Sequence, residues 1–478
     1  MIELNRRTLL QGAGLGLAGL SLPRLTTLAQ DADMLDEVVI DLSTEPASLA
    51  PAQIYEPNGW SVAHAIFDAP FDYDASGNPV MVAAESMRWV DDLTLEIRMQ
   101  SSLTFHDGTS LSSQSLVASY NTIIAPETGS SIAGNFATIA GIEAVDEITA
   151  RITVSQPSPW LPAQIATWML CIHPDSTSAA EVSAAPVGTG PYQFVEWVPG
   201  ERIVLTANPN YNVPNKGKPI ARQVTYRFVT ESSTRVSDLQ SGTAHIVRSV
   251  PQDQVQSVQD AGHEVRAVPQ SSVAFVRIAT DVAPFDDVRV RQALNYAVDV
   301  DEIRLALLGG AGERLPNVFV PNGMGYSEEL EPYPYDPDRA RDLLNEAGVS
   351  DLSTTLAVTN SERLDLVEAI AAYLGDVGIN VTVEQQEIAV FNAGWTDPAA
   401  PPLRFASWRP MFDPFNLLNL VFSSNGFLSR HNNPNVQTLI DAAAVATDPV
   451  ERESLYRQLG QVMFDEPAAL YLWNVTAL

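Results

Sequence analysis

The stretch Ala185-Pro-Val-Gly-Thr-Gly-Pro-Tyr192 decides how the middle of this chain folds. Gly188, Gly190 and Pro191 predict a tight turn in which one backbone segment passes close to another. Residues 192–206 then alternate apolar and polar side chains around a Pro-Gly turn, which predicts a β-hairpin. We therefore expect a rigid corner that leads directly into a pair of antiparallel strands.

The composition describes a large, acidic, globular protein. The chain has 478 residues, of which 45% are hydrophobic, and this length is sufficient for two or three domains. Asp and Glu number 58 against 27 Lys and Arg, so the formal net charge at pH 7 is −31. Such a surface repels phosphate backbones, which argues against a nucleic-acid partner. The acidity does not by itself indicate the charge of any small ligand.

The first 29 residues are expected to be a targeting segment. Arg6 and Arg7 precede an apolar run over residues 9–22, an arrangement that resembles a twin-arginine export signal. A membrane anchor is the alternative, but about 14 apolar residues fall short of the roughly 20 that a spanning helix needs. Residues 27–29 fit a signal-peptidase site, so we expect cleavage near Ala29 and a periplasmic location.

Cysteine usage excludes an internal disulfide framework. Cys171 is the single cysteine and lies in an apolar run, where a buried, inert thiol is expected. No cysteine follows the expected cleavage site to carry a lipid anchor. A freely diffusing monomer without a direct membrane anchor is therefore expected.

The second half of the chain alternates helical and strand patterns. Apolar residues recur at helical spacing over residues 290–298 and 364–377, and the latter run is followed by an alternating strand over residues 379–383. Asp336-Pro337 and Asp448-Pro449 predict helix starts, with aspartate as the N-cap and proline in the first turn. This alternation predicts an α/β domain with a largely parallel sheet.

Several motifs, in order along the chain, resemble those of one known family. They are the stretch 83–109 ending in Phe-His-Asp-Gly-Thr, the stretch 141–146, the corner at 186–197, Asn208-Pro-Asn-Tyr211, the stretch 286–297 and Tyr335-Asp-Pro-Asp-Arg-Ala340. Each motif alone is weak, but their ordered recurrence is specific. The chain is identified as a member of the extracytoplasmic solute-binding proteins of family 5, which serve ABC importers of peptides and nickel. In that family the His106-Asp107 pair belongs to a structural turn, not to a catalytic dyad.

The resemblance implies a two-lobed periplasmic-binding-protein fold of type II. This is an α/β fold with mixed sheets flanked by helices and an extra subdomain in lobe one. Mapped onto this sequence, lobe one comprises residues 30–57, 187–272 and 455–478, the extra subdomain residues 58–186, and lobe two residues 273–454. Two crossings between the lobes would then form a hinge.

The resemblance also implies the function. The chain is expected to capture a small, peptide-like solute between two closing lobes and to deliver it to ABC permease subunits, with no cofactor, no metal and no enzymatic activity. The alternatives are a non-peptide solute such as an opine, a sugar or a metal chelate, or a sensor-type binding protein. A secreted hydrolase is a remote alternative, because the sequence has no Gly-x-Ser-x-Gly, Ser-x-x-Lys or His-Glu-x-x-His motif.

Seven side chains are candidates for ligand contact. Aromatic residues offer apolar area and arginine can hold a carboxylate. The candidates are Trp60, Trp395, Trp408, Arg409, Phe412, Asp413 and His431. Peptide-binding relatives place a carboxylate for the ligand amine where this chain has Pro410. Asp413 is then the nearest replacement, and capping of the following helix is its alternative role.

Overall fold

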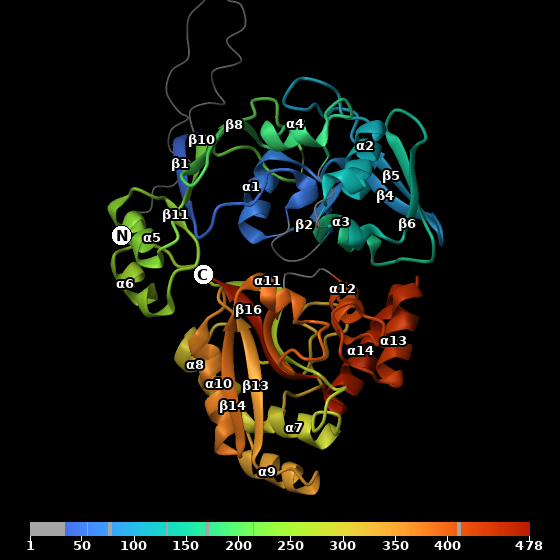
Figure 1. The fold of residues 1–478 in the computed structure, drawn as a ribbon. Helices are drawn as coiled ribbons and strands as arrows, with labels where there is room; N and C mark the ends of the chain where they lie inside the picture. The colour runs from blue at the N-terminus through green and yellow to red at the C-terminus, as the bar shows by residue number, and fades with distance from the viewer. Residues whose placement is uncertain are drawn as a thin grey trace, which may run out of the picture.

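The computed structural model describes residues 34–54, 56–74, 79–130, 132–167, 172–213, 215–408 and 413–478. The expected leader, Cys171, Arg409, Pro410 and Phe412 lie outside these ranges. Two bodies lie one above the other, the first running from blue to green and the second from yellow to red (Figure 1). In the described part of the chain, every helix is too short or too polar to cross a membrane.

Lobe one is built on a five-stranded sheet of order β11-β1-β10-β9-β8. Its strands are β1 (Leu35–Leu42), β8 (Tyr192–Val198), β9 (Arg202–Ala207), β10 (Ala221–Phe228) and β11 (Ile246–Val247). β1 runs parallel to β10 and β11, while β8, β9 and β10 are antiparallel. The β8–β9 hairpin predicted from the sequence is therefore present. Helix α1 (Pro57–Ile66) packs its apolar face on this sheet, and α5 (Ser232–Ser241) and α6 (Val255–Asp260) lie beyond β11 (Figure 1).

The extra subdomain has its own four-stranded antiparallel sheet, in the order β4-β5-β7-β6. The strands are β4 (Ala84–Asp91), β5 (Thr94–Met99), β6 (Ile139–Ala144) and β7 (Thr149–Val154). A small hairpin and three helices complete it: β2 (Phe71–Tyr73), β3 (Pro79–Met81), α2 (Ser113–Ile124), α3 (Leu161–Thr167) and α4 (Ala179–Ala184). Its core is separate from that of the first sheet.

Lobe two is built on a five-stranded mixed sheet of order β14-β13-β15-β12-β16. The strands are β12 (Val268–Ile278), β13 (Leu352–Thr359), β14 (Ile379–Gln386), β15 (Leu403–Trp408) and β16 (Ala469–Ala477). β13 is parallel to β14 and β15, but β12 is antiparallel to both of its neighbours. The sheet is thus mixed, as the family resemblance implies, and less parallel than the helix–strand alternation suggests.

Helices cover both faces of this sheet. One face packs against α7 (Val288–Ala297), α8 (Val300–Leu308), α9 (Pro337–Glu346) and α10 (Leu364–Asp376). The other packs against α11 (Ile388–Ala393), α12 (Phe415–Leu417), α13 (Pro434–Val445) and α14 (Pro449–Asp465). Because both faces are covered, the central strands β12 and β15 are largely buried and mostly apolar, and Arg277 and Arg404 are their buried charged residues.

The C-terminal segment belongs to lobe two, not to lobe one as expected. β16 pairs with β12 in antiparallel register, and α14 packs against α13. Leu470 and Leu472 enter one core of lobe two while Ala469 and Tyr471 enter the other. A strand that is apolar on both faces needs two covering layers, and helices cover both faces of the lobe-two sheet. Within the described residues the chain consequently crosses between the lobes once, in the segment before β12.

The corner at residues 185–192 fixes the junction between lobe one and the extra subdomain. A Cβ added to Gly190 would lie 2.5 Å from the carbonyl carbon of Ile66, and one on Gly188 would overlap the Ile66 carbonyl oxygen. His106 clasps the same corner, because its Nε2 lies 3.0 Å from the Gly190 oxygen and its backbone N–H donates to Gly188. Burial lowers the pKa of His106, which suits this structural role.

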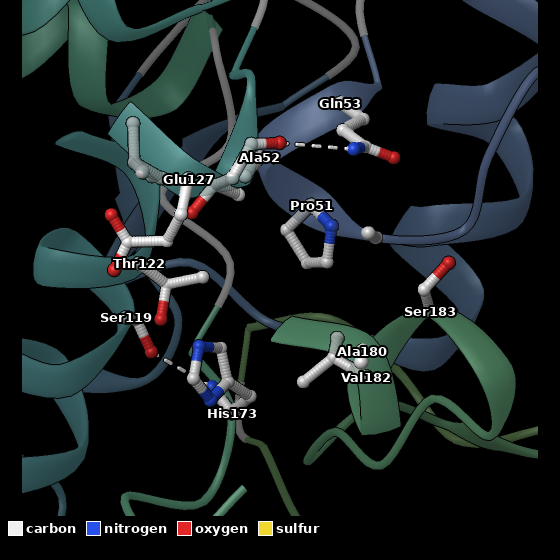
Figure 2. Close-up of a pocket in the computed structure, with 13 residues that line it drawn as sticks. Pro51, Ala52, Gln53, Ser119, Thr122, Glu127, His173, Ala180, Val182 and Ser183 are labelled. Carbon is white, nitrogen blue, oxygen red and sulfur yellow. Dashed lines mark hydrogen bonds between the residues drawn. The ribbon is translucent and has the colours of Figure 1, made fainter. Parts of the chain in front are cut away.

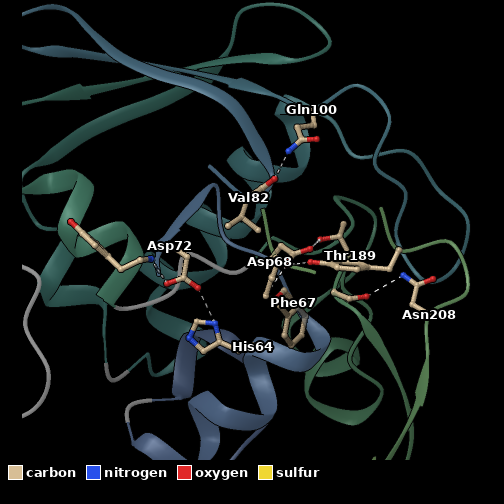
Figure 3. Close-up of polar contacts among 12 residues, drawn as sticks. His64, Phe67, Asp68, Asp72, Val82, Gln100, Thr189 and Asn208 are labelled. Carbon is tan, nitrogen blue, oxygen red and sulfur yellow. Dashed lines mark hydrogen bonds and ion pairs between the residues drawn. The ribbon is translucent and has the colours of Figure 1, made fainter. Parts of the chain in front are cut away.

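Asp68 ties the corner to the rest of lobe one (Figure 3). Its carboxylate is fully buried and accepts hydrogen bonds from Thr189 Oγ1 at 2.9 Å and Tyr211 Oη at 3.3 Å. Lys216 Nζ lies 2.7 Å from the same carboxylate, so the buried charge is paired. The corner and the loop between β9 and β10 therefore both contact a side chain that lies more than 100 residues earlier in the sequence.

The corner should tolerate no side chain at Gly190. We expect Gly190→Ala to reduce the free energy of unfolding by about 1–3 kcal/mol, because the new methyl group would overlap backbone. Gly141→Ala is the matched control, since nothing lies within 4 Å of the added Cβ there. Urea unfolding of both variants measures the effect, and equal stability of the two would contradict the close approach.

Candidate ligand-binding cleft

A cleft of about 1100 Å³ lies between the two lobes, beside the segment where the chain crosses. Lobe one contributes Pro57, Ser232 and residues 248–253 to its lining. Lobe two contributes the end of α8, the loop after β13, and side chains of β15 and β16. The position between two lobes is where small-molecule sites are most often found.

The wall from lobe one carries a guanidinium group. Arg248 Nη1 donates to Asn58 Oδ1 at 3.1 Å and to Ser61 Oγ at 3.0 Å, both of which are uncharged. Burial lowers the pKa of Arg248, against the opposing attraction of Glu56. Among the described residues no carboxylate pairs directly with it. Its positive charge is available to an anionic group of a ligand.

The backbone around Arg248 is held by a second arginine. Arg235 is buried, and it donates to the carbonyl oxygens of Arg248 at 3.0 Å and Ser249 at 3.1 Å. Ser249 has a positive φ of 59°, and its N–H donates to the Leu478 oxygen at 2.8 Å. This last bond joins lobe one to the end of the lobe-two sheet, so the wall is anchored on both sides.

The wall from lobe two carries a carboxylate. Glu362 follows β13, and its carboxylate accepts a hydrogen bond from Ser407 Oγ at 3.3 Å. Burial raises the pKa of Glu362 above its ordinary value. The neighbouring Arg363 is already paired with Asp365 and also donates to the Leu307 carbonyl oxygen at 2.8 Å. Glu362 is thus a half-buried acid of the cleft without a cationic partner among the described residues.

The sequence analysis missed this acid, although a signal for it exists. Glu362 lies just beyond the carboxyl end of β13, which is parallel to β14 and β15. In α/β sheets ligands bind at the carboxyl ends of parallel strands. Recognition of the strand at 352–359 would have drawn attention to the loop that follows it.

The five described candidates from the sequence lie elsewhere. None of them is among the residues that line the cleft. Trp395 and Trp408 are buried in the second core of lobe two, with ring centroids 6.4 Å apart. His431 is buried near Thr280, and burial lowers its pKa to about 4, so its ring is neutral at pH 7. Trp60 is half-buried between the two cores of the first body. Their contact with a ligand stays a prediction.

Asp413 forms a buried ion pair. Its carboxylate accepts two hydrogen bonds from Arg452, at 2.5 and 2.9 Å, and one from the Phe415 N–H at 2.9 Å. Burial alone would lower the pKa of Arg452, but the neighbouring Asp413 carboxylate raises this pKa above its ordinary value. Both oxygens of Asp413 are therefore occupied. This geometry favours the structural role over amine recognition.

The two lobes touch on the side of Asp413. The rings of Trp160 in the extra subdomain and Phe415 in lobe two stack with centroids 4.0 Å apart and an interplanar angle of 10°. Beside them, Asn416 Nδ2 donates to Asn135 Oδ1 at 3.1 Å. Direct contacts between residues more than 200 positions apart describe a closed arrangement of the lobes.

A second, smaller pocket of about 280 Å³ lies within the first body (Figure 2). It is lined by residues 50–53, by α2 and by α4, with His173 at one side. Lobe two contributes no residue to its lining. We therefore place ligand capture in the cleft between the lobes. The described residues contain no group of three His, Cys, Asp or Glu side chains that could hold a metal ion.

Two lobes that face each other across a charged cleft define a bilobal binding protein. Residues 78–429 match the family model described as "Bacterial extracellular solute-binding proteins, family 5 Middle". The chain belongs to this family, and it functions as a substrate-binding component of an ABC importer.

Relatives and solved structures agree with this assignment. The glutathione-binding protein GsiB of Pectobacterium atrosepticum is 27% identical over 469 residues, covering 91% of this chain and 88% of its own. The periplasmic binding protein DppA from Helicobacter pylori, solved with the peptide STSA, has a TM-score of 0.79 at 22% identity, over 93% of this chain and 94% of its own. AgaA from A. tumefaciens, solved with agropinic acid, has a TM-score of 0.76 at 25% identity, covering 92% of each chain.

The ion pair of Asp413 generates a prediction. Asp413→Asn should reduce the free energy of unfolding by about 3–5 kcal/mol, because it leaves the buried Arg452 cation without an anionic partner. Binding of a free-amine peptide and of its N-acetylated form should weaken equally. Asp376→Asn, at an exposed helix end, is the control. Selective loss of the free-amine peptide in calorimetric titrations would assign amine recognition to Asp413 instead.

Proposed function

We propose that the solute is peptide-like and carries both a free amine and a carboxylate. The single observation behind this proposal is the pair of uncommitted opposite charges on facing walls of the cleft. Glu362 of lobe two is suited to an ammonium group, and Arg248 of lobe one is suited to a carboxylate. Two similar proteins, one a glutathione-binding protein and the other solved in complex with the peptide STSA, support the same class of ligand.

A zwitterionic solute would also drive closure. Each of its charged ends would contact a different lobe, so both contacts form together only when the lobes are closed. A ligand shifts an open–closed equilibrium by the contacts it makes in the closed state alone. We propose residues 34–260 as one moving unit and residues 268–478 as the other, with the connecting segment as the hinge.

Export, location and docking on the transporter complete the proposed role. We propose that the leader ending near Ala29 directs twin-arginine export, that the mature protein acts in the periplasm as a monomer, and that the closed form docks on ABC permease subunits. We also propose that it carries out no chemistry on its solute. Hydrogen bonds and charge attraction in the cleft are sufficient for reversible capture.

The role of Glu362 is tested by its amide variant. Glu362→Gln should weaken binding of a free-amine peptide at least tenfold, about 1.4 kcal/mol, and leave the N-acetylated peptide unaffected. Glu368→Gln is the control, because Glu368 is exposed on α10 outside the cleft. Peptides that stabilise the wild type in a thermal-shift screen serve as probes for calorimetric titration. Absence of any stabilising peptide would move the assignment to a non-peptide solute.

The same titration has a pH signature. Attraction of an ammonium group requires the ionised carboxylate, and burial raises the pKa of Glu362. Affinity for the free-amine peptide should therefore fall on acidification at a higher pH than an ordinary glutamate would allow. In Glu362→Gln this loss should be absent, and an unchanged pH profile in the variant would argue against the assigned role.

Closure is tested by the stacked rings that join the lobes. Phe415→Ala should weaken peptide binding roughly two- to tenfold, because an aromatic pair contributes about 0.5–1.5 kcal/mol and here it forms only between closed lobes. Phe427→Ala is the control, since Phe427 is 76% exposed in lobe two. Small-angle scattering should show contraction of the wild type on peptide binding. An unchanged radius at saturation would contradict closure.

A further inference from the structure

Two arginines lie side by side in the interior of lobe two. Arg277 of β12 and Arg404 of β15 are directly opposite in the antiparallel register, so both side chains leave the same face of the sheet. They are 1% and 0% exposed, respectively. Burial of two like charges at adjacent positions is unfavourable unless another group compensates them.

The hydrogen-bonding groups of this pair are largely unused. All three guanidinium nitrogens of Arg277 lack a partner among the described residues, as do Nε and Nη1 of Arg404. Only Arg404 Nη2 is engaged, by the Phe391 carbonyl oxygen. A guanidinium group has five N–H donors and no acceptor, so the two groups cannot satisfy each other. An acceptor is required between them.

The surroundings form an aromatic enclosure. The Arg277 and Arg404 guanidinium carbons lie 5.3 and 5.6 Å from the centre of the Trp395 ring, and that of Arg404 lies 4.1 Å from the Phe391 ring. Gly394 packs directly against Arg404, because a Cβ added to Gly394 would lie 2.6 Å from Arg404 Nη1. Ring faces attract the cations but accept few of their N–H groups.

The nearby acids are committed elsewhere. Asp281 pairs with the buried Arg430 at 3.0 Å, and the Glu384 carboxylate accepts from Gln386 at 2.7 Å. Three guanidinium groups and two carboxylates leave one positive charge without compensation. Burial and the charge of Arg404 lower the pKa of Arg277 to about 9, and burial lowers that of Arg404 to about 10, so both are still cationic at pH 7.

This place is separate from the solute cleft. Phe405 and Ser407 of β15 line the cleft. Arg404 directly precedes Phe405 in the same strand and is not part of the lining. Successive side chains of a strand point to opposite faces of the sheet. The arginine pair lies with Phe391 and Trp395 on the face covered by α11, and Phe405 packs in the other core.

We propose that Arg277 and Arg404 hold one buried monovalent inorganic anion, a halide such as chloride. A single negative charge balances the uncompensated positive charge, and a spherical anion accepts hydrogen bonds from two forks at once. A divalent oxyanion would overcompensate the charge and carry a larger desolvation penalty. The anion is a resident part of lobe two and stabilises the fold independently of the solute.

Thermal unfolding at constant ionic strength tests the proposal. Replacing gluconate by chloride or bromide should raise the Tm of the wild type by about 2 °C or more, because the halide binds only the folded state. Arg277→Met should lose this dependence, and in gluconate its Tm should equal or exceed that of the wild type, since one uncompensated charge is removed. Arg266→Met is the control, because Arg266 is exposed, and it should keep the full halide effect.

Crystals of the wild type grown or soaked in bromide provide a second test, and this test does not require any variant to fold. Anomalous scattering should place bromide between the Arg277 and Arg404 guanidinium groups. Equal Tm values in chloride and gluconate, or the absence of a bromide peak at this position, would overturn the proposal.

Discussion

The buried Asp68 carboxylate is the interaction on which the arrangement of the first body depends. Thr189 from the corner and both Tyr211 and Lys216 from the loop between β9 and β10 contact it. Because a buried carboxylate must be paired, these loops have one arrangement that satisfies it. The close contact of Gly188 and Gly190 with Ile66 then fixes the end of α1 against the corner. The extra subdomain leaves lobe one at this point, so its orientation follows.

The cleft depends on that orientation. α1 begins at Pro57, which lines the cleft, and Asn58 and Ser61 of the same helix hold the guanidinium group of Arg248. At the other end of the first body, Trp160 meets Phe415 of lobe two. The corner joins lobe one, which carries Arg248, to the extra subdomain, which carries Trp160. The charge on each wall can then be presented to the same solute.

Local signals were sufficient for many elements. Asp336 and Asp448 cap α9 and α14 as predicted, because capping depends only on the next few residues. The β8–β9 hairpin and the succession of α10 and β14 were likewise readable from spacing. The position of β16 was not, because its pairing with β12 joins strands about 200 residues apart, and nothing in an apolar run specifies its partner. For the same reason the local pattern pointed to aromatic candidates near Asp413 but not to Glu362, whose importance depends on the opposite wall of the cleft.

Native mass spectrometry of gently purified protein, followed by fragmentation of whatever is released, tests the central claim most directly. The account predicts a single small solute that carries both an amine and a carboxylate and leaves the protein unaltered. A retained solute that lacks either group, or a solute that the protein converts into a product, would contradict it.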